Sequence, residues 1–192
     1  HKLSDEIISD QKKLQGFNKE MYLKRIEKFY EKYNPLMTDI VSYIGTLDLY
    51  SNIAQISIEN IYQRPILSDS GKSFISAKGI RHPIVEKVNT SELYVPNDIE
   101  LGEDGILLYG TNACGKSTLM KSIGLSLIMA QAGFFVPCSS FEYSPYTQLF
   151  TRILNNDNLF KGQSSFAVEM SELRGILLRA DKHSLVLGDE LC

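Results

Sequence analysis

A glycine-rich loop at residues 110–117 has the clearest chemical content in the sequence. It reads Gly110-Thr-Asn-Ala-Cys-Gly-Lys-Ser117, follows an apolar run and precedes a helix-like segment. This is the P-loop pattern, in which glycines let successive backbone N–H groups point inward while a helix N-terminus adds partial positive charge. Both features attract phosphate. The predicted nucleotide-binding residues of this loop are Gly110, Thr111, Asn112, Ala113, Cys114, Gly115, Lys116, Ser117 and Thr118.

Two side chains of the loop have separate predicted roles. Lys116 can reach the β- and γ-phosphates of a nucleotide, and we count it among the catalytic residues. The hydroxyl of Ser117 is placed to coordinate Mg²⁺. The alternative for this loop is a glycine turn that binds no ligand.

A second polar pair, Asp189-Glu190, follows the apolar run Ser184–Gly188. Ligands of open α/β sheets bind beyond the carboxyl ends of the strands, which is where this pair would lie. Asp189 is predicted to hold the metal, and Glu190 to orient or deprotonate the attacking water. Alone, such a pair is typical of a solvated strand end. Joined to a P-loop, it predicts a nucleotide hydrolysis site, whereas a nucleotide kinase would need a second substrate pocket for which the sequence gives no signal.

The elements that must position these residues alternate from Gly105 onward, which indicates an α/β fold with a mainly parallel sheet. The apolar run Ile106–Tyr109 is typical of a strand that is buried on both faces. The remaining predicted elements are a helix at 117–132, a strand at 148–154, a helix at 166–181 and a strand at 184–188.

The residues upstream of the loop are mostly helical in character. One long helix is expected from Lys2 to Tyr33, either lying on a domain or projecting to pack on segments outside this chain. Asn34-Pro35 predicts the start of a second helix that runs to about Ile58. Residues 64–105 hold short β-prone pieces, such as Phe74-Ile75 and Leu93–Val95, and are expected to form a small sheet edge. The predicted domains are a helical part at 1–62 and a P-loop domain at 63–192.

Composition excludes few classes of function. The 192 residues carry a net charge of −3, so overall charge gives no reason to predict nucleic-acid binding. Three cysteines without paired short spacing indicate a reducing intracellular compartment. No apolar run approaches the roughly 18 residues of a membrane span, and no membrane partner is expected. The chain starts without methionine and stops directly after a predicted strand, so we expect a fragment of a longer protein.

At this point the motifs resemble a known family, the ATPase domain of the MutS mismatch-repair proteins. The resemblance runs from about Leu36 to the last residue, while Lys2–Tyr33 is similar to the end of that family's lever helix. It implies a P-loop NTPase fold with an ABC-type ATPase sheet, truncated after the Walker B strand. The motifs that carry it, in the family's order, are Arg81-His-Pro-Ile-Val-Glu86, Tyr94-Val-Pro-Asn-Asp98, the P-loop through Thr118, Ala132-Gly-Phe-Phe-Val-Pro137, Leu149-Phe-Thr-Arg-Ile153, Gly162-Gln-Ser-Ser-Phe166 with Val168-Glu-Met170, and Ser184–Glu190.

The departures from the family pattern point to one branch. The commonest loop in the family has Pro at the position of Thr111 and Met-Gly at the positions of Ala113-Cys114. After Asp189-Glu190 the chain continues Leu191-Cys192 rather than with a glycine. These differences look most like the organellar and giant-virus members.

The resemblance also implies roles that the residues alone leave open. Tyr94 would stack on the adenine, although a tyrosine in this setting is also compatible with a core position. Asn112 would contact the phosphate side of the nucleotide. Ser164 would reach the nucleotide of an opposing subunit, which implies a homodimer with two composite ATP sites, whereas by itself it is a simple helix cap. Cys114 carries the hypothesis that its oxidation or alkylation blocks ATP, against the simpler expectation of an inert small residue.

The function that follows is an ATP-driven conformational switch in DNA mismatch recognition or repair, with ATP or ADP and Mg²⁺ as cofactors. Double-stranded DNA with mismatches would be bound by domains absent from this chain, and activity is expected of the full-length protein rather than of the fragment. One alternative is a MutS-like protein that controls recombination on branched DNA. Another is a structural ATPase of the chromosome or transporter type, whose Ser-Gly-Gly signature the sequence lacks.

Overall fold

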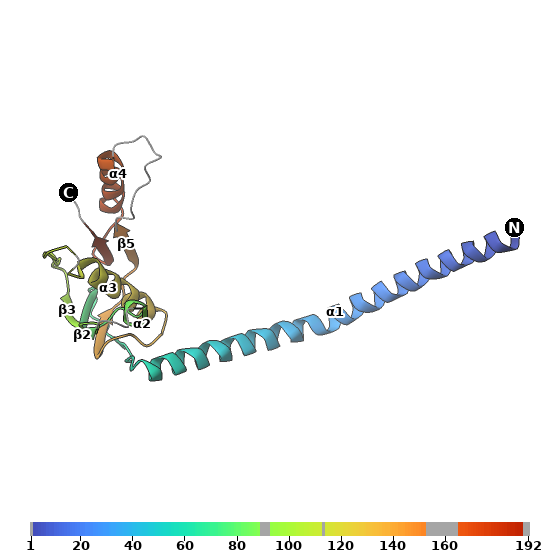
Figure 1. Ribbon diagram of the computed structural model, residues 1–192, viewed down its shortest axis with the longest axis horizontal. Helices are drawn as coiled ribbons and strands as arrows, with labels where there is room; N and C mark the ends of the chain where they lie inside the picture. The colour runs from blue at the N-terminus through green and yellow to red at the C-terminus, as the bar shows by residue number, and fades with distance from the viewer. Residues whose placement is uncertain (1, 89–92, 113, 153–164, 190–192) are drawn as a thin grey trace. The chain divides into compact units, whose positions relative to one another are not determined.

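The computed structural model describes residues 2–88, 93–112, 114–152 and 165–189 (Figure 1). The chain divides into two compact units, residues 1–52 and residues 53–192. The division falls inside the first helix, upstream of the boundary at 62/63 that the sequence predicts. Among the residues that the structure describes, the first unit is helical and the strands all belong to the second.

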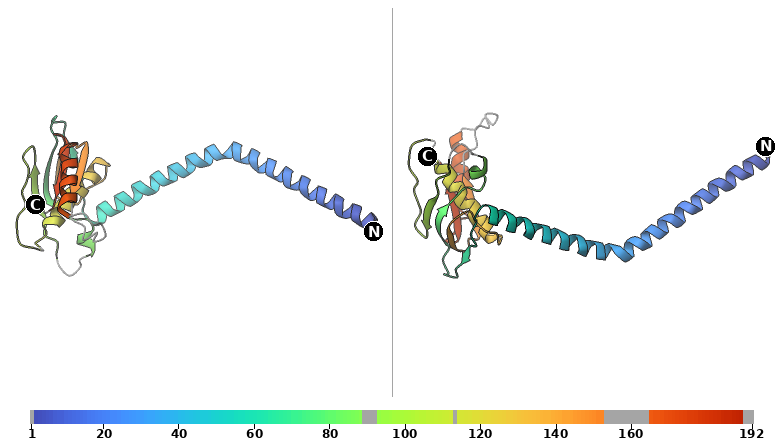
Figure 2. Two further views of the ribbon diagram at one scale, coloured as in Figure 1. Left: turned by 90° about the horizontal axis from the view of Figure 1, so that it is seen from above. Right: turned by 60° about the horizontal axis from the view of Figure 1, so that its bottom comes forward.

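A single helix, α1 (Lys2–Glu59), replaces the two helices predicted around Asn34-Pro35. The expectation of a helix start at this position was therefore wrong. Proline inside a helix removes one backbone hydrogen bond and bends the helix without having to end it. Figure 2 shows α1 bending near its middle, in the light-blue part of the ribbon. Beside the proline, the hydroxyl of Thr38 donates to the carbonyl of Asn34 at 2.9 Å.

The carboxyl end of α1, which belongs to the second unit, finishes in a tight turn. The N–H of Tyr62 donates to the carbonyl of Ser57 at 2.9 Å, and Ile61 has a φ of 54°. This pattern is a Schellman-type helix end, which places one residue in the left-handed region. A β-branched residue rarely adopts that conformation. The turn at Ile61 must therefore be held by its surroundings.

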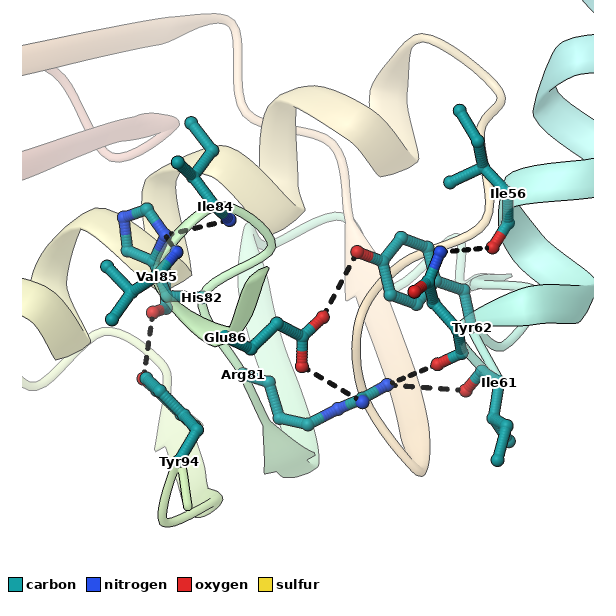
Figure 3. A network of polar contacts seen from close by, with 11 residues as sticks. Ile56, Ile61, Tyr62, Arg81, His82, Ile84, Val85, Glu86 and Tyr94 are labelled. Atoms are coloured by element: carbon teal, nitrogen blue, oxygen red, sulfur yellow. Dashed lines mark hydrogen bonds and ion pairs between the residues drawn. The ribbon is translucent and has the colours of Figure 1, made fainter. Parts of the chain in front are cut away.

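The surroundings that hold it are the side chains of Arg81 and Glu86, drawn in Figure 3. The guanidinium of Arg81 donates to the carbonyls of Asn60 and Ile61, at 2.9 and 3.4 Å, and pairs with Glu86 at 3.0 Å. Glu86 in turn accepts a hydrogen bond from the hydroxyl of Tyr62 at 3.2 Å. Burial raises the pKa of the Tyr62 phenol to about 12, and the negative charge of Glu86 is the next largest cause. This hydroxyl therefore stays a donor.

A four-stranded sheet forms one part of the second unit. Its strands are β1 (Ile66–Leu67), β2 (Phe74–Ile80), β3 (Asn97–Leu101) and β4 (Ser140–Ser144), in the order β1-β4-β2-β3. β1 and β4 are parallel, whereas β2 is antiparallel to both β3 and β4. The sheet edge predicted at 64–105 is present, and Phe74-Ile75 begins β2 as expected, but Leu93–Val95 is not a strand. The short helix α2 (Val85–Val88) lies between β2 and β3 in the sequence.

A separate parallel pair, β5 (Gln148–Arg152) and β6 (Ser184–Gly188), forms a second sheet. The helix α4 (Ser165–Leu177) lies between these strands in the sequence, and α3 (Lys116–Gln131) follows the glycine-rich loop. The strand at 184–188 is confirmed, and the helix expected at 117–132 is confirmed to within one residue at each end. The expected parallel pairing is seen in β5 and β6. The larger sheet draws three of its four strands from residues 64–105, where a small sheet edge was expected.

The strand predicted at Ile106–Tyr109 is not present. These residues have no regular secondary structure, and the side chains of Leu107 and Tyr109 are 88% and 91% exposed. A strand forms only where a neighbour accepts and donates its backbone hydrogen bonds. Among the described residues, β6 pairs with β5 alone. An apolar run shows that a segment can be buried, but it does not show whether a neighbouring strand is there to pair with it.

One hydrophobic core joins α3 to both sheets. Most of its members, all buried, come from β2, β3, β4, β6 and α3, and they include Ile75, Ile80, Phe141, Ile123, Leu127, Leu185 and Leu187. A polar contact also links the sheets, since a ring nitrogen of His183 lies 2.9 Å from the hydroxyl of Ser73. Over the part of the chain that the structure describes, no helix is long and apolar enough to span a membrane.

Candidate nucleotide-binding site

The glycine-rich loop bends tightly before α3, and two of its glycines are required by the geometry. Gly115 immediately precedes α3 with a φ of 96°, a conformation that side chains disfavour. A Cβ added at Gly110 would lie 2.9 Å from the Sγ of Cys114, so the two ends of the loop touch. The N–H of Cys114 also donates to the carbonyl of Thr111 at 3.4 Å. Gly110 and Cys114 therefore lie close together, and the P-loop assignment stays a prediction.

Lys116 lies over this loop. Its ammonium donates to the carbonyls of Gly110 and Thr111, both at 2.9 Å. A phosphate bound inside the loop would offer anionic oxygens to the same ammonium, and charge-assisted hydrogen bonds are stronger than those to neutral carbonyls. The position of Lys116 is thus compatible with the predicted phosphate contact.

Ser117 and Asp189, which the sequence predicts as metal ligands, lie in direct contact. The hydroxyl of Ser117 donates to Oδ2 of Asp189 at 2.6 Å, although 72 residues separate them in the sequence. Asp189 directly follows β6, and its N–H donates to the carbonyl of Arg152 in β5 at 2.8 Å. An alcohol and a carboxylate are hard oxygen donors, which is the ligand type that Mg²⁺ prefers. The pair therefore fits a magnesium ion.

A close approach of α3 to β6 makes this contact possible. A Cβ added at Gly124 would lie only 2.8 Å from Cδ1 of Leu187 in β6. Gly124 follows Ser117 by two helical turns and so lies on the same face of α3. Sequence reasoning missed Gly124. The available signal was its position inside a strongly apolar helix, where glycine costs stability.

Tyr94 lies against another face of α3. Its hydroxyl is 3.2 Å from the hydroxyl of Ser122, which is fully buried in the helix. Tyr94 itself is half-buried, whereas its neighbours Leu93 and Val95 are 97% and 74% exposed. The segment thus turns one aromatic ring onto the helix that starts at the phosphate loop. Ser122 is a second residue that sequence reasoning missed.

The remaining predicted site residues are placed as follows. Asn112 and Cys114 are exposed, and Thr118 lies in the first turn of α3, where its carbonyl accepts from Ser122 at 2.8 Å. Three residues, Ala113, Ser164 and Glu190, lie outside the described residues. Their roles in phosphate binding, in a partner's site and in water activation stay predictions.

The motif Arg81–Glu86 makes polar contacts within itself and with the end of α1. Besides the contacts at the end of α1, the ring of His82 accepts hydrogen bonds from the N–H groups of Ile84 and Val85, both at 3.2 Å (Figure 3). Burial lowers the pKa of His82 below its ordinary value, and the positive charge of Lys121 on α3 is the second cause. A neutral ring suits this position because Nδ1 must be an acceptor.

Comparison with known proteins gives this geometry a context. Residues 106–192 match the family model described as MutS domain V. The matched residues include the glycine-rich loop, α3 and Asp189, which together form the phosphate and metal part of the candidate site. Tyr94 lies just upstream of the match.

Relatives that are similar along nearly the whole chain carry the same name. The chain is 39% identical, over its full length, to the mitochondrial DNA mismatch repair protein mutS homolog of Sarcophyton glaucum, and covers 20% of that protein. It is 36% identical over 94% of its length to a mutS homolog of Acanthamoeba polyphaga mimivirus, of which it also covers 20%. It is 40% identical over 96% of its length to the DNA mismatch repair protein MutS of Lactobacillus johnsonii, covering 22% of it. The chain therefore spans about a fifth of the length of these relatives.

Proposed function

We propose that this chain is the ATP-binding and ATP-hydrolysing segment of a MutS-type DNA mismatch-repair protein. The observation that carries the proposal is the 2.6 Å contact between Ser117, at the start of α3, and Asp189, at the end of β6. It brings the two predicted metal ligands together within the stretch that matches MutS domain V. The curled loop and the position of Lys116 support a P-loop NTPase fold around this contact.

In the proposed mechanism each residue has one task. The backbone of residues 110–117 and the N-terminus of α3 hold the phosphates, and Lys116 places its charge beside the β- and γ-phosphates. Ser117 and Asp189 hold Mg²⁺, which when bound supplies positive charge against the phosphates. Glu190 orients the attacking water and accepts its proton. Tyr94 covers the base with its aromatic face.

Hydrolysis at this site serves a conformational switch in the proposed function. Ser164 contacts the γ-phosphate of a partner subunit, so that ATP favours the closed homodimer. A ligand shifts a conformational equilibrium only by its differential affinity for the two states, and a contact made across subunits provides that difference. The names of the relatives support mismatched DNA as the partner, bound by parts of the protein outside this chain. The mitochondrial and mimivirus relatives support the organellar and giant-virus branch.

The first test measures nucleotide binding and hydrolysis in the full-length protein. Lys116→Ala is expected to weaken ATP binding by roughly tenfold or more, because a charge-assisted contact to phosphate is lost. Glu190→Gln is expected to bind ATP normally and to hydrolyse it roughly a hundredfold more slowly. Lys24→Ala is the matched control, since Lys24 is an exposed residue of α1 paired with Glu20. Normal turnover in Glu190→Gln would remove Glu190 from the role of base.

The second test asks which DNA the switch responds to. Release of fluorescent ADP is followed by stopped-flow on perfectly paired, mismatched and branched DNA. Faster release on a mismatch is the expected result, because mismatch recognition and nucleotide exchange are then coupled. Acceleration by branched DNA alone would favour a protein that controls recombination, and no response to any DNA would favour a structural ATPase.

A further inference from the structure

We infer that Ser122 is a positioning residue, which fixes the ring of Tyr94 at the place where the base of a bound nucleotide lies. This inference rests on the proposed function, because it assigns a specific task to a residue that supports the nucleotide site. The juxtaposition that carries it is the contact between a buried hydroxyl of α3 and the phenol of a half-buried aromatic residue.

The direction of the hydrogen bonds makes Ser122 an acceptor for Tyr94. The hydroxyl of Ser122 donates its only proton to the carbonyl of Thr118, one turn earlier in α3, at 2.8 Å. Its oxygen is then available to accept from the hydroxyl of Tyr94 at 3.2 Å. Ser122 is 0% exposed, so water does not compete for this position. The phenol therefore has one contact with a residue of a helix.

The hydrogen bond between Tyr94 and Ser122, which we call the tether, lies at a suitable distance from the proposed phosphate site. An α-helix rises about 1.5 Å per residue, so Ser122 lies roughly 9 Å along the axis of α3 from Lys116. The ribose and α-phosphate of a nucleotide bridge a gap of this order between the β-phosphate and the base. Thr118 and Ser122 share one face of α3, beside the face of Ser117 that meets β6. One face of α3 can therefore support the base while the neighbouring face holds the metal ion.

The surroundings of Tyr94 argue for a task beyond packing. Leu93 and Val95 are largely exposed on either side, and among the described residues the segment pairs with no strand. An aromatic face stabilises a stacked base only while the ring keeps its orientation, and ordering a free ring on binding costs conformational entropy. The bond to Ser122 orders the ring before the nucleotide arrives. It accordingly increases the affinity for nucleotides with a base and leaves the affinity for bare phosphates unchanged.

The test compares ADP with its base-free counterpart, inorganic pyrophosphate, in the full-length protein. Binding of ADP is measured by isothermal titration calorimetry, and binding of pyrophosphate by competition with fluorescent ADP. Tyr94→Phe keeps the aromatic face but removes the tether, and Ser122→Ala removes the acceptor. Each variant is expected to weaken ADP about fivefold, as the loss of one neutral hydrogen bond would, without changing the affinity for pyrophosphate. The double variant is expected to lose no more than either single variant, because both remove the same bond.

Two controls match the chemistry of these changes. Ser126→Ala alters a serine of the same helix that is equally buried and whose hydroxyl has no hydrogen-bond partner among the described residues. Tyr50→Phe removes a phenol hydroxyl from an exposed residue of α1. Both controls are expected to bind ADP as the parent protein does.

The outcomes separate the inference from the proposed function. If the parent protein binds ADP and both Tyr94→Phe and Ser122→Ala bind it equally well, the tether has no role and only the inference fails. Equal weakening of ADP and pyrophosphate would also overturn it, because the bond would then support the fold and not the base. If the parent protein binds neither ligand, the proposed function fails together with the inference.

Discussion

Ser117 and Asp189 are far apart in the sequence, and only their predicted role as metal ligands suggested that they would be in contact. A hydroxyl at the start of a helix and a carboxylate at the end of a strand have no structural need for one another, and many such residues face solvent. Here they lie 2.6 Å apart. Because both are oxygen donors of the kind that Mg²⁺ prefers, the contact has a direct functional consequence that can be measured.

Ser117→Ala is expected to weaken nucleotide binding only when Mg²⁺ is present. Loss of a ligand in a charged network costs about 2 kcal/mol, equivalent to roughly thirtyfold in affinity. Titrations with ATP in magnesium and in EDTA, performed on the full-length protein, measure this difference. Ser117→Thr retains the hydroxyl and is the matched control. An equal loss of affinity in EDTA would show that Ser117 supports the loop instead of the metal.

His82 gives a prediction about pH. Burial and the charge of Lys121 lower its pKa in the folded protein, while the carboxylate of Glu86 acts in the opposite direction more weakly. In the unfolded chain the pKa returns to about 6.5. As pH falls below that value the unfolded state binds a proton first, so the free energy of unfolding decreases. Above pH 6.5 both states are neutral at this residue, and its contribution is constant.

The variant His82→Asn should flatten this dependence, because an amide oxygen can accept from the N–H groups of Ile84 and Val85 without titrating. Urea unfolding of the chain between pH 5 and 8 gives the slopes. The sequence contains no tryptophan, so near-UV circular dichroism of the tyrosines is the suitable signal. Identical slopes for the parent and the variant below pH 6.5 would contradict the assignment to His82.

Among the elements, the end of α1 depends most on tertiary contacts. Ile61 adopts a left-handed conformation that costs on the order of 1–3 kcal/mol for such a residue. The Arg81 guanidinium satisfies two carbonyls of this turn and pairs with Glu86, and these groups are largely buried. The turn is therefore stable only while Arg81 is in place.

Arg81→Met is expected to loosen the carboxyl end of α1 by about 2 kcal/mol, since it leaves the Glu86 carboxylate and two carbonyls without their partner. Amide hydrogen exchange of peptides that cover residues 53–63 measures this opening directly. Lys72→Met is the control, because Lys72 belongs to an exposed ion pair with Glu103, and such pairs contribute little. Unchanged protection at residues 53–63 in Arg81→Met would mean that the turn at Ile61 is held by other contacts.

Local patterns in the sequence predicted the elements well where one segment decides its own structure. The helix α3 has an apolar face and a glycine before it, and the strand β6 has a continuous apolar run, so both were predicted with nearly correct bounds. Pairing partners were not predictable in this way. Ile106–Tyr109 has the composition of a strand but pairs with no other strand among the described residues. Pro35 was misread because a proline can either start a helix or bend one.

The residues of the candidate site likewise fall into those that the sequence predicts and those that it does not. Its glycines, Lys116, Ser117 and Asp189 follow from spacing and from the chemistry of phosphate. Ser122 and Gly124 could not be found, because their importance comes from what α3 touches. A serine and a glycine inside an apolar helix are unremarkable until Tyr94 and Leu187 are seen beside them.

At the scale of the whole chain, the helix of the first unit carries an apolar stripe on its surface. Between residues 36 and 47 of α1, Leu36, Ile40, Ile44 and Leu47 recur at helical spacing, and each is between 41% and 58% exposed. Thr38, Ser42 and Gly45 occupy the opposite face. An exposed apolar stripe of this length is characteristic of a surface that packs on another helix.

The isolated chain is consequently expected to self-associate through this stripe at micromolar concentrations, because burying apolar side chains contributes about 25 cal/mol per Å². Sedimentation velocity over a range of concentrations measures the association. Replacing Ile40 and Ile44 by glutamine should keep the chain monomeric, since both changes remove apolar area from the centre of the stripe. The same replacement at Thr38 and Ser42, on the polar face, should leave the association unchanged. If both pairs of substitutions had the same effect, contacts elsewhere in the chain would drive the association, and the stripe would have no part in it.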